Sequence, residues 1–231
     1  MTTPRSLILH IGTHKTGTTS IQAFLREELG APTFPVGLYF ADNHIECLVA
    51  WARPQLCEFL TKLNVSWQEH AATDRLEREL GSSAPTLIYS CEQLSLMREP
   101  AELQRVRAAC GDRELHVVVY TRSPEGFLRS YAFSRALLGA RPSSDPDSLD
   151  SVEADSWLVD YETRIALWQR YADSITIVNY DEVCARDGSV IPSFAALLGL
   201  TPARDYRLNT TPELRERLAV ALLRAGAATS S

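Results

Sequence analysis

The feature that most constrains this chain is a short apolar run that leads through a glycine-rich loop into a helix. Residues 6–11 (SLILHI) predict a buried strand that stops at Gly12. The loop that follows, residues 12–20, reads GTHKTGTTS. Apolar residues then recur at helical spacing, at Ile21, Phe24, Leu25 and Leu29. A strand, a glycine-rich loop and a helix in this order form a cradle whose backbone N–H groups and helix N-terminus hold an anion such as phosphate.

The rest of the chain alternates between strand and helix patterns. Further strands are predicted at residues 38–40, 86–90, 114–121 and 174–180, which are rich in β-branched and aromatic residues. Helices are predicted at residues 45–54, 56–63 and 157–171, from Pro124 onward, and from about residue 211. This alternation predicts an α/β fold: a single P-loop-like domain over residues 1–231, with a central, mainly parallel β-sheet flanked by helices. Ligands of such sheets bind at the carboxyl ends of the strands.

Composition and charge exclude several classes of protein. The chain has 231 residues and a formal net charge of −6, so it lacks the basic surface that binding to nucleic acid or an anionic membrane requires. No apolar run is long enough to span a membrane, and the start of the chain lacks a signal-peptide pattern. The five cysteines show no zinc-site spacing and indicate reduced thiols. These features predict a cytoplasmic protein.

One segment differs in composition from the rest of the chain. Residues 141–156 (RPSSDPDSLDSVEADS) combine two prolines with five acidic residues and few apolar ones. The pattern fits a solvated surface loop. It also fits a mobile acidic flap over a binding site, and the sequence leaves both interpretations open.

The glycine-rich loop resembles a P-loop, with one important difference. Gly12 and Gly17 have the spacing of GxxxxGK[ST], but Thr18 stands where the lysine belongs, and Lys15 lies inside the loop. Of the 23 basic residues only Lys15 and Lys62 are lysine, so a lysine in this loop is notable. Its compact ammonium group suits a single bridging oxygen.

Residues 15–19 (KTGTT), after a strand and before a helix, resemble the 5′-phosphosulfate loop of the sulfotransferases that use 3′-phosphoadenosine 5′-phosphosulfate (PAPS). The chain differs from the family's usual pattern by having His14 where proline is common. The resemblance implies that Lys15, Thr16, Gly17, Thr18, Thr19 and Ser20 bind PAPS, and that Lys15 neutralises charge on the leaving oxygen.

A second resemblance follows the strand at residues 114–121. Arg122 directly follows this strand, and Ser130 lies eight residues later, in a helix predicted to start at Pro124. This resembles the family's 3′-phosphate motif, in which an arginine fork and a serine hydroxyl hold one anion. Tyr180, followed by Asp181-Glu182, resembles the turn that closes the family's cofactor site, and the likeness makes Tyr180 a candidate adenine neighbour. The family's C-terminal phosphate-binding turn has no clear counterpart.

The resemblance implies transfer of a sulfuryl group from PAPS to a hydroxyl or amine, releasing adenosine 3′,5′-bisphosphate without a metal ion. The acceptor would be a small molecule or a carbohydrate. A hydroxyl acceptor needs a general base, and the candidates are Glu92, which follows a strand, and His14 in the loop. Glu92 also fits a plain helix N-terminal position. Two alternatives stay open: a P-loop kinase that uses ATP and Mg²⁺, and a non-catalytic nucleotide-binding domain.

Overall fold

Five parallel strands form one sheet in the order β2-β3-β1-β4-β5. The strands are β1 (Ser6–His10), β2 (Leu38–Phe40), β3 (Thr86–Ser90), β4 (Glu114–Thr121) and β5 (Ser174–Asn179). The structure is a computed structural model that describes residues 5–29, 38–40, 47, 51–53, 69–137 and 141–207. The predicted α/β class with a parallel sheet is confirmed.

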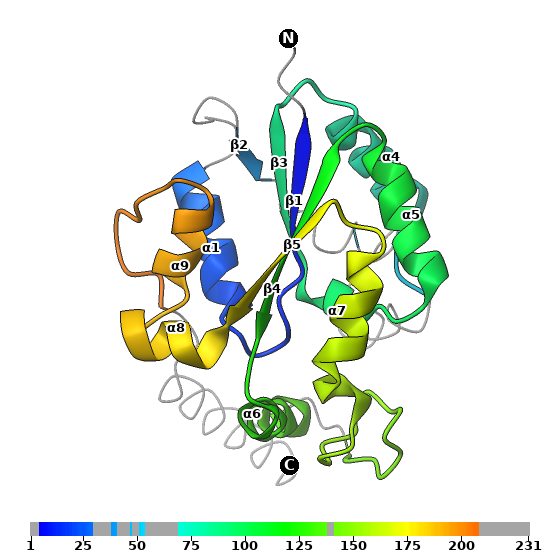
Figure 1. The fold of residues 1–231 in the computed structure, drawn as a ribbon, viewed down its shortest axis with the longest axis vertical. Helices are drawn as coiled ribbons and strands as arrows, with labels where there is room; N and C mark the ends of the chain where they lie inside the picture. The colour runs from blue at the N-terminus through cyan, green and yellow to red at the C-terminus, as the bar shows by residue number, and fades with distance from the viewer. Residues whose placement is uncertain are drawn as a thin grey trace, which may run out of the picture.

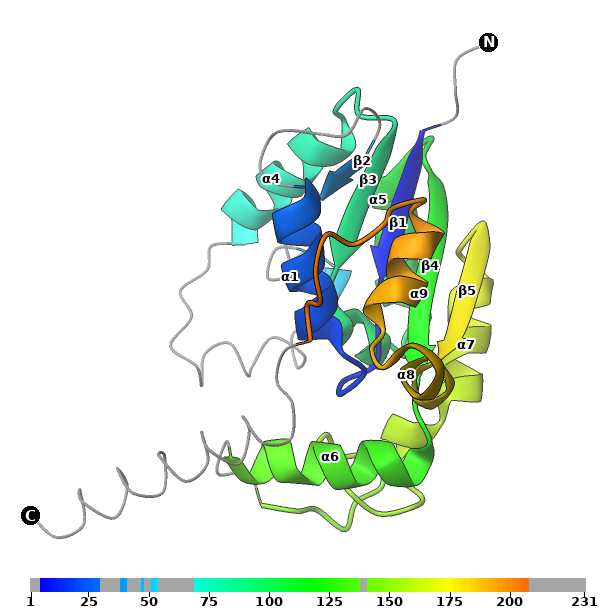
Figure 2. The same cartoon turned by 90° about the vertical axis from the view of Figure 1, so that its left-hand side faces the viewer.

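The sheet is covered by helices on both faces (Figure 1). One face carries α1 (Thr18–Leu29), α8 (Tyr180–Asp187) and α9 (Ile191–Leu197), and the other carries α4 (Glu69–Leu80), α5 (Pro100–Cys110) and α7 (Tyr161–Gln169). A further helix, α6 (Pro124–Leu137), crosses beneath the carboxyl edge of the sheet (Figure 2). No helix in the described ranges is long and apolar enough to cross a bilayer.

Strand β4 shows how the sequence builds both cores. Successive side chains of a strand point to opposite faces of the sheet. Val117 accordingly joins an apolar cluster with Trp168 of α7, whereas Tyr120 joins a cluster with Phe24 of α1 and Phe194 of α9. A strand buried on both faces reads as a continuous apolar run, and the run HVVVY has this form.

Strand β1 lies between the two strands that carry the other predicted site residues. His10 at its end is paired with Ser90 of β3 and with Val118 of β4. Glu92 follows two residues after Ser90, and β4 continues past Val118 to Thr121 and Arg122. The loop after β1 therefore shares one edge of the sheet with Glu92 and Arg122.

Most predicted elements agree with the structure, and one needs correction. A single helix at residues 157–171 is wrong, because the segment divides into a 3₁₀ turn η2 (Trp157–Val159) and α7. Asp160 separates them, and its carboxylate accepts a hydrogen bond from the Thr163 N–H as the N-cap of α7. The strand predicted at residues 174–180 ends at Asn179, which caps α8. The helices predicted at residues 45–63 and from residue 211 lie almost wholly outside the described residues.

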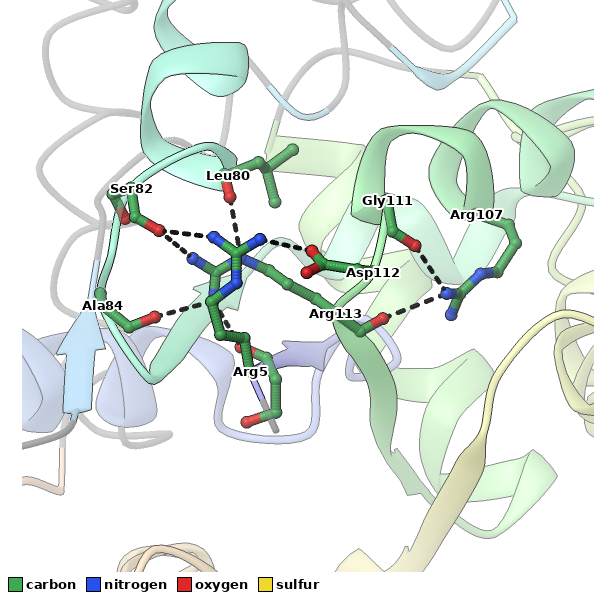
Figure 3. A network of polar contacts seen from close by, with 9 residues as sticks. Arg5, Leu80, Ser82, Ala84, Arg107, Gly111, Asp112 and Arg113 are labelled. Carbon is green, nitrogen blue, oxygen red and sulfur yellow. Dashed lines mark hydrogen bonds and ion pairs between the residues drawn. The ribbon is translucent and has the colours of Figure 1, made fainter. Parts of the chain in front are cut away.

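At the opposite edge of the sheet, one arginine joins several segments (Figure 3). Arg113 is fully buried just before β4. Its guanidinium donates hydrogen bonds to the carbonyl oxygens of Leu80, Ser82 and Ala84 at 2.7–2.8 Å, and to that of Ser6 at 3.3 Å. Burial lowers the pKa of Arg113. The side chain thus fixes the start of β1, the start of β4 and the turn after α4 to one another.

Candidate anion-binding site

The loop after β1 is held against β4 by its own backbone. The Ile11 N–H donates to the Val118 oxygen at 3.0 Å, and the Thr13 N–H donates to the Tyr120 oxygen at 3.1 Å. The Thr16 hydroxyl donates to the Thr13 oxygen at 2.5 Å. Thr16, predicted to bind the cofactor, therefore uses its hydroxyl to brace the loop from within.

Three loop residues have positive φ angles: Gly12 at 45°, Lys15 at 67° and Gly17 at 79°. Lys15 is the one non-glycine residue with positive φ in the part of the chain that the structure describes. A residue with a Cβ atom pays a steric penalty at positive φ, so the backbone of Lys15 is strained at the predicted ligand site.

The two glycines are also required by close packing. A Cβ atom on Gly12 would lie 2.6 Å from Thr18 Cγ2, and a Cβ atom on Gly17 would lie 2.8 Å from Val190 Cγ2. Such distances are shorter than any normal carbon contact. Helix α1 starts at once, at Thr18, so the loop delivers a helix N-terminus. Of the predicted hydroxyl donors in that first turn, Thr18 and Ser20 are buried and Thr19 is exposed.

Arg122 connects the end of β4 with this loop. Its Nη1 donates to the Lys15 carbonyl oxygen at 3.2 Å, and its guanidinium carbon lies 5.0 Å from the centre of the Tyr180 ring. Its Nε is buried without a hydrogen-bond partner, 3.5 Å from Asp181 Oδ1. The structure thus places Arg122 next to both Lys15 and Tyr180, and their binding of a cofactor stays a prediction. A buried unpaired N–H is the kind of donor that a ligand oxygen would satisfy.

Ser130 is half-buried on α6, two turns beyond its start. The described polar contacts of the Arg122 side chain go to Lys15 and Asp181, and none of them joins it to Ser130. The proposed pairing of Arg122 with Ser130 around one anion therefore stays a prediction.

Glu92 begins the 3₁₀ turn η1 (Glu92–Leu96) after β3. The Gln22 Nε2 atom of α1 donates to Glu92 Oε2 at 3.2 Å and to the Ser90 carbonyl oxygen at 3.2 Å. Sequence reasoning missed Gln22, although its place one helical turn after Thr18 was a usable signal. Burial, together with the charge of Arg122, lowers the pKa of Lys15, while Glu92 acts in the opposite direction. Glu92 is therefore within electrostatic reach of the loop lysine.

The two histidines next to the loop differ in their surroundings. The half-buried His14 ring packs edge-to-face against Tyr131 of α6, with 5.8 Å between the ring centres. His10 is fully buried, and its Nδ1 lies 2.8 Å from Ser90 Oγ. Burial lowers the pKa of His10 to about 4, and the Glu92 charge offsets part of that effect. His10 is therefore a core residue beneath the loop, and its burial favours the neutral form.

The acidic segment at residues 141–156 makes contacts with the helices beside the site. Asp147 pairs with Arg98 at 2.7 Å, and Asp150 forms an ion pair with Arg135 of α6. The Tyr131 hydroxyl donates to the Leu149 carbonyl oxygen at 3.0 Å. The segment therefore packs beside α6, and its mobility stays a prediction.

Two further findings concern metal sites and thiols. The described ranges contain no group of three or more His, Cys, Asp or Glu residues placed to hold a metal ion. Cys110 and Cys184 are free thiols.

Comparison with known proteins supports the fold. No family model and no curated protein matches the sequence. Among solved structures, a sulfotransferase from Alicyclobacillus acidocaldarius aligns over 96% of this chain and 95% of its own, with a TM-score of 0.59 and 16% identity. A sulfotransferase domain from the curacin biosynthetic pathway aligns over 88% and 76%, with a TM-score of 0.46 and 10% identity. A kinase candidate from Chloroflexus aurantiacus aligns over 85% and 97%, with a TM-score of 0.44 and 14% identity. The chain thus has a fold that a bacterial sulfotransferase also has.

Proposed function

We propose that this chain is a PAPS-dependent sulfotransferase, which moves a sulfuryl group to a hydroxyl or amine of a small-molecule or carbohydrate acceptor. The observation that carries the proposal is the contact between the two predicted motifs. The Arg122 Nη1 donates to the Lys15 carbonyl oxygen, which joins the end of β4 to the loop after β1. One anionic ligand with two charged groups can engage both motifs there.

The residues of the site suit such a donor. Thr18 and Val190 pack so closely against the two loop glycines that neither position has room for a Cβ atom. The unpaired Arg122 Nε can donate a hydrogen bond to a ligand. In the proposal, the loop amides with Thr18, Thr19 and Ser20 hold the phosphosulfate, Arg122 and Ser130 hold the 3′-phosphate, and Tyr180 lies beside the adenine. PAPS supplies an activated sulfuryl group whose leaving group is a stabilised phosphate.

Positioning and charge stabilisation dominate a loose, in-line transfer. Lys15 neutralises the negative charge that grows on the bridging oxygen as the S–O bond breaks. Its pKa is lowered by burial and by Arg122, yet the nearby Glu92 carboxylate favours the charged form that this role needs. Glu92 accepts the proton of an acceptor hydroxyl as the new O–S bond forms. The competing base, His14, packs against Tyr131.

Thermal unfolding with adenosine 3′,5′-bisphosphate, compared with ATP plus Mg²⁺, tests the proposal. A ligand at about 100 times its dissociation constant stabilises a protein by about 2.7 kcal/mol, which raises the melting temperature by roughly 5–10 °C. We expect this shift with the bisphosphate in the absence of metal, and its loss in Lys15→Ala and Arg122→Ala. Arg129→Ala is the matched control, because Arg129 is exposed on α6 and pairs with Glu125.

A shift with ATP and Mg²⁺ alone would replace the proposal with a P-loop kinase. Transfer itself is tested with labelled PAPS and a panel of phenols, amino sugars and glycans. Glu92→Gln should bind the bisphosphate as the wild type does and transfer nothing. Binding without transfer to any acceptor by the wild type would favour the non-catalytic nucleotide-binding domain.

A further inference from the structure

An internal carboxylate occupies the place beside Arg122 where a ligand anion would be expected. Asp181 Oδ1 lies 3.5 Å from Arg122 Nε, and Asp181 Oδ2 accepts a hydrogen bond from the Ser123 N–H at 2.8 Å. Ser123 immediately precedes α6, so this N–H belongs to the helix N-terminus. A guanidinium and a helix N-terminus together form an anion site.

The fit between Asp181 and Arg122 is incomplete. The 3.5 Å separation exceeds a normal hydrogen bond, and Arg122 Nε is buried without a hydrogen-bond partner. The other described contacts of the guanidinium are the Lys15 carbonyl oxygen and the Tyr180 ring. The carboxylate therefore supplies negative charge to this arginine but leaves the Nε donor without a hydrogen bond.

Asp181 can leave without unfolding the segment that carries it. Its backbone N–H is fixed by Asn179 Oδ1 at 3.0 Å, at the start of α8, so the main chain is anchored. Its side chain is 43% exposed, so a rotation about its χ angles returns the carboxylate to water. The position is thus held by a group that another anion can displace.

We propose that Asp181 determines how strongly this site selects a 3′-phosphate. The inference rests on the proposed function, since it assumes that the 3′-phosphate of a nucleotide approaches Arg122. A phosphate dianion must displace the carboxylate or bind beside it against like-charge repulsion. A nucleotide that has a 3′-hydroxyl meets no such repulsion and can donate a hydrogen bond to the carboxylate. Asp181 therefore weakens the preference for the 3′-phosphate that Arg122 creates.

The test measures the dissociation constants of adenosine 3′,5′-bisphosphate and adenosine 5′-monophosphate for the wild type and for Asp181→Asn. The asparagine amide oxygen can still accept from the Ser123 N–H, so the helix start keeps its partner. We expect Asp181→Asn to bind the bisphosphate on the order of ten-fold more tightly, and the monophosphate with less than about three-fold change. Asp181→Ser is a second neutral variant, should the first be poorly folded.

Asp187→Asn is the matched control, because it removes the same charge from α8, where Asp187 pairs with Arg186 rather than Arg122. Equal changes for both nucleotides, or weaker bisphosphate binding in both Asp181 variants, would overturn the inference while leaving the proposed function intact. Absence of bisphosphate binding in the wild type and in both variants would instead overturn the proposed function, and the inference with it.

Discussion

The carbonyl oxygen of Lys15 accepts a hydrogen bond from Arg122 Nη1 at 3.2 Å, across 107 residues of sequence. The accepting residue is also the one whose backbone lies in the left-handed region, with φ at 67°. Arg122 therefore contacts the strained position of the loop directly. The Arg122 side chain thus joins the end of β4 to the loop after β1 at the loop's strained residue.

Replacing Lys15 with glycine should leave the fold intact and remove ligand binding. Glycine adopts positive φ without the penalty of roughly 1 kcal/mol that lysine carries, and this gain offsets glycine's greater entropy loss on folding. We expect the melting temperature of Lys15→Gly to stay within about 3 °C of wild type or to rise. The shift caused by adenosine 3′,5′-bisphosphate should disappear.

Lys15→Val is the comparison, because a β-branched residue tolerates positive φ poorly. It should lower the melting temperature by at least about 2–4 °C. A larger loss of stability in Lys15→Gly than in Lys15→Val would show that the lysine side chain, and not its backbone, holds the loop.

Gln22 should act as a positioning residue for Glu92, since its amide donates to the Glu92 carboxylate and to the Ser90 carbonyl oxygen. Gln22→Met removes both bonds in a helix that tolerates methionine, so kcat for sulfuryl transfer should fall by about ten-fold with little change in donor affinity. Gln22→Glu places a second carboxylate beside the first. The acid limb of its pH–rate profile should therefore move to higher pH.

A structural role alone would not move the pH profile, which makes Gln22→Glu the decisive variant. Gln104→Met, on the exposed side of α5, is the matched control and should change neither rate nor profile. An unchanged profile in Gln22→Glu would exclude Glu92 as the group that titrates in the reaction.

His10 should make folding stability depend on pH in a narrow window. Its pKa is about 4 in the folded protein against 6.5 for the free side chain, so the unfolded chain binds more protons between these values. The contribution of neutral His10 to the free energy of unfolding should thus be fully present above about pH 6.5. It should decline by up to about 3 kcal/mol as the pH falls to about 4.

Urea unfolding at several pH values measures this slope. The carboxylates with lowered pKa values, such as Asp173, lose their contribution only at more acidic pH. Between pH 6.5 and 5 the slope should therefore shrink in His10→Gln. The same slope in wild type and variant would show that His10 is not the source.

Arg113 should matter for stability and not for binding. Arg113→Met removes the arginine's hydrogen bonds to four carbonyl oxygens in a buried setting, at a cost of roughly 2–4 kcal/mol. Arg5→Ala removes a partly exposed pair with Asp112 and one hydrogen bond to the Ser82 oxygen, which keeps its bond from Arg113, so it should cost less than about 1 kcal/mol. Bisphosphate affinity, measured by calorimetry on the folded protein, should be the same in both variants. A weaker affinity in Arg113→Met would show that the two edges of the sheet are coupled.

The sequence predicts the strands well because their signal is local. The run at residues 114–121 matches β4 residue for residue, since a strand buried on both faces must be continuously apolar. Gly12 and Gly17 mark the loop because only glycine fits positions that combine positive φ with close packing. The proximity of Lys15 and Arg122 follows from parallel strands that end at one edge.

What the sequence does not show depends on contacts between distant residues. Whether the Thr16 hydroxyl faces a ligand or the Thr13 oxygen is decided by the fold of the loop. The roles of Gln22 and Asp181 arise from hydrogen bonds to residues far away in sequence. The division of residues 157–171 at Asp160 is a case where a capping carboxylate outweighs an apolar stripe of helical spacing.

The order of the strands also sets the spacing of the residues along the candidate site. Glu92, Lys15, Arg122 and Asp181 follow the neighbouring strands β3, β1, β4 and β5 in that spatial order. Strands are separated by about 4.8 Å, so these residues sample a span of roughly 14 Å in steps of one strand. Substitutions can change the side chain at each of these positions, but the distance between neighbouring strands is set by backbone hydrogen bonds. The spacing of the four backbone positions is therefore a property of the sheet, and substitutions alter only the side chains that extend from them.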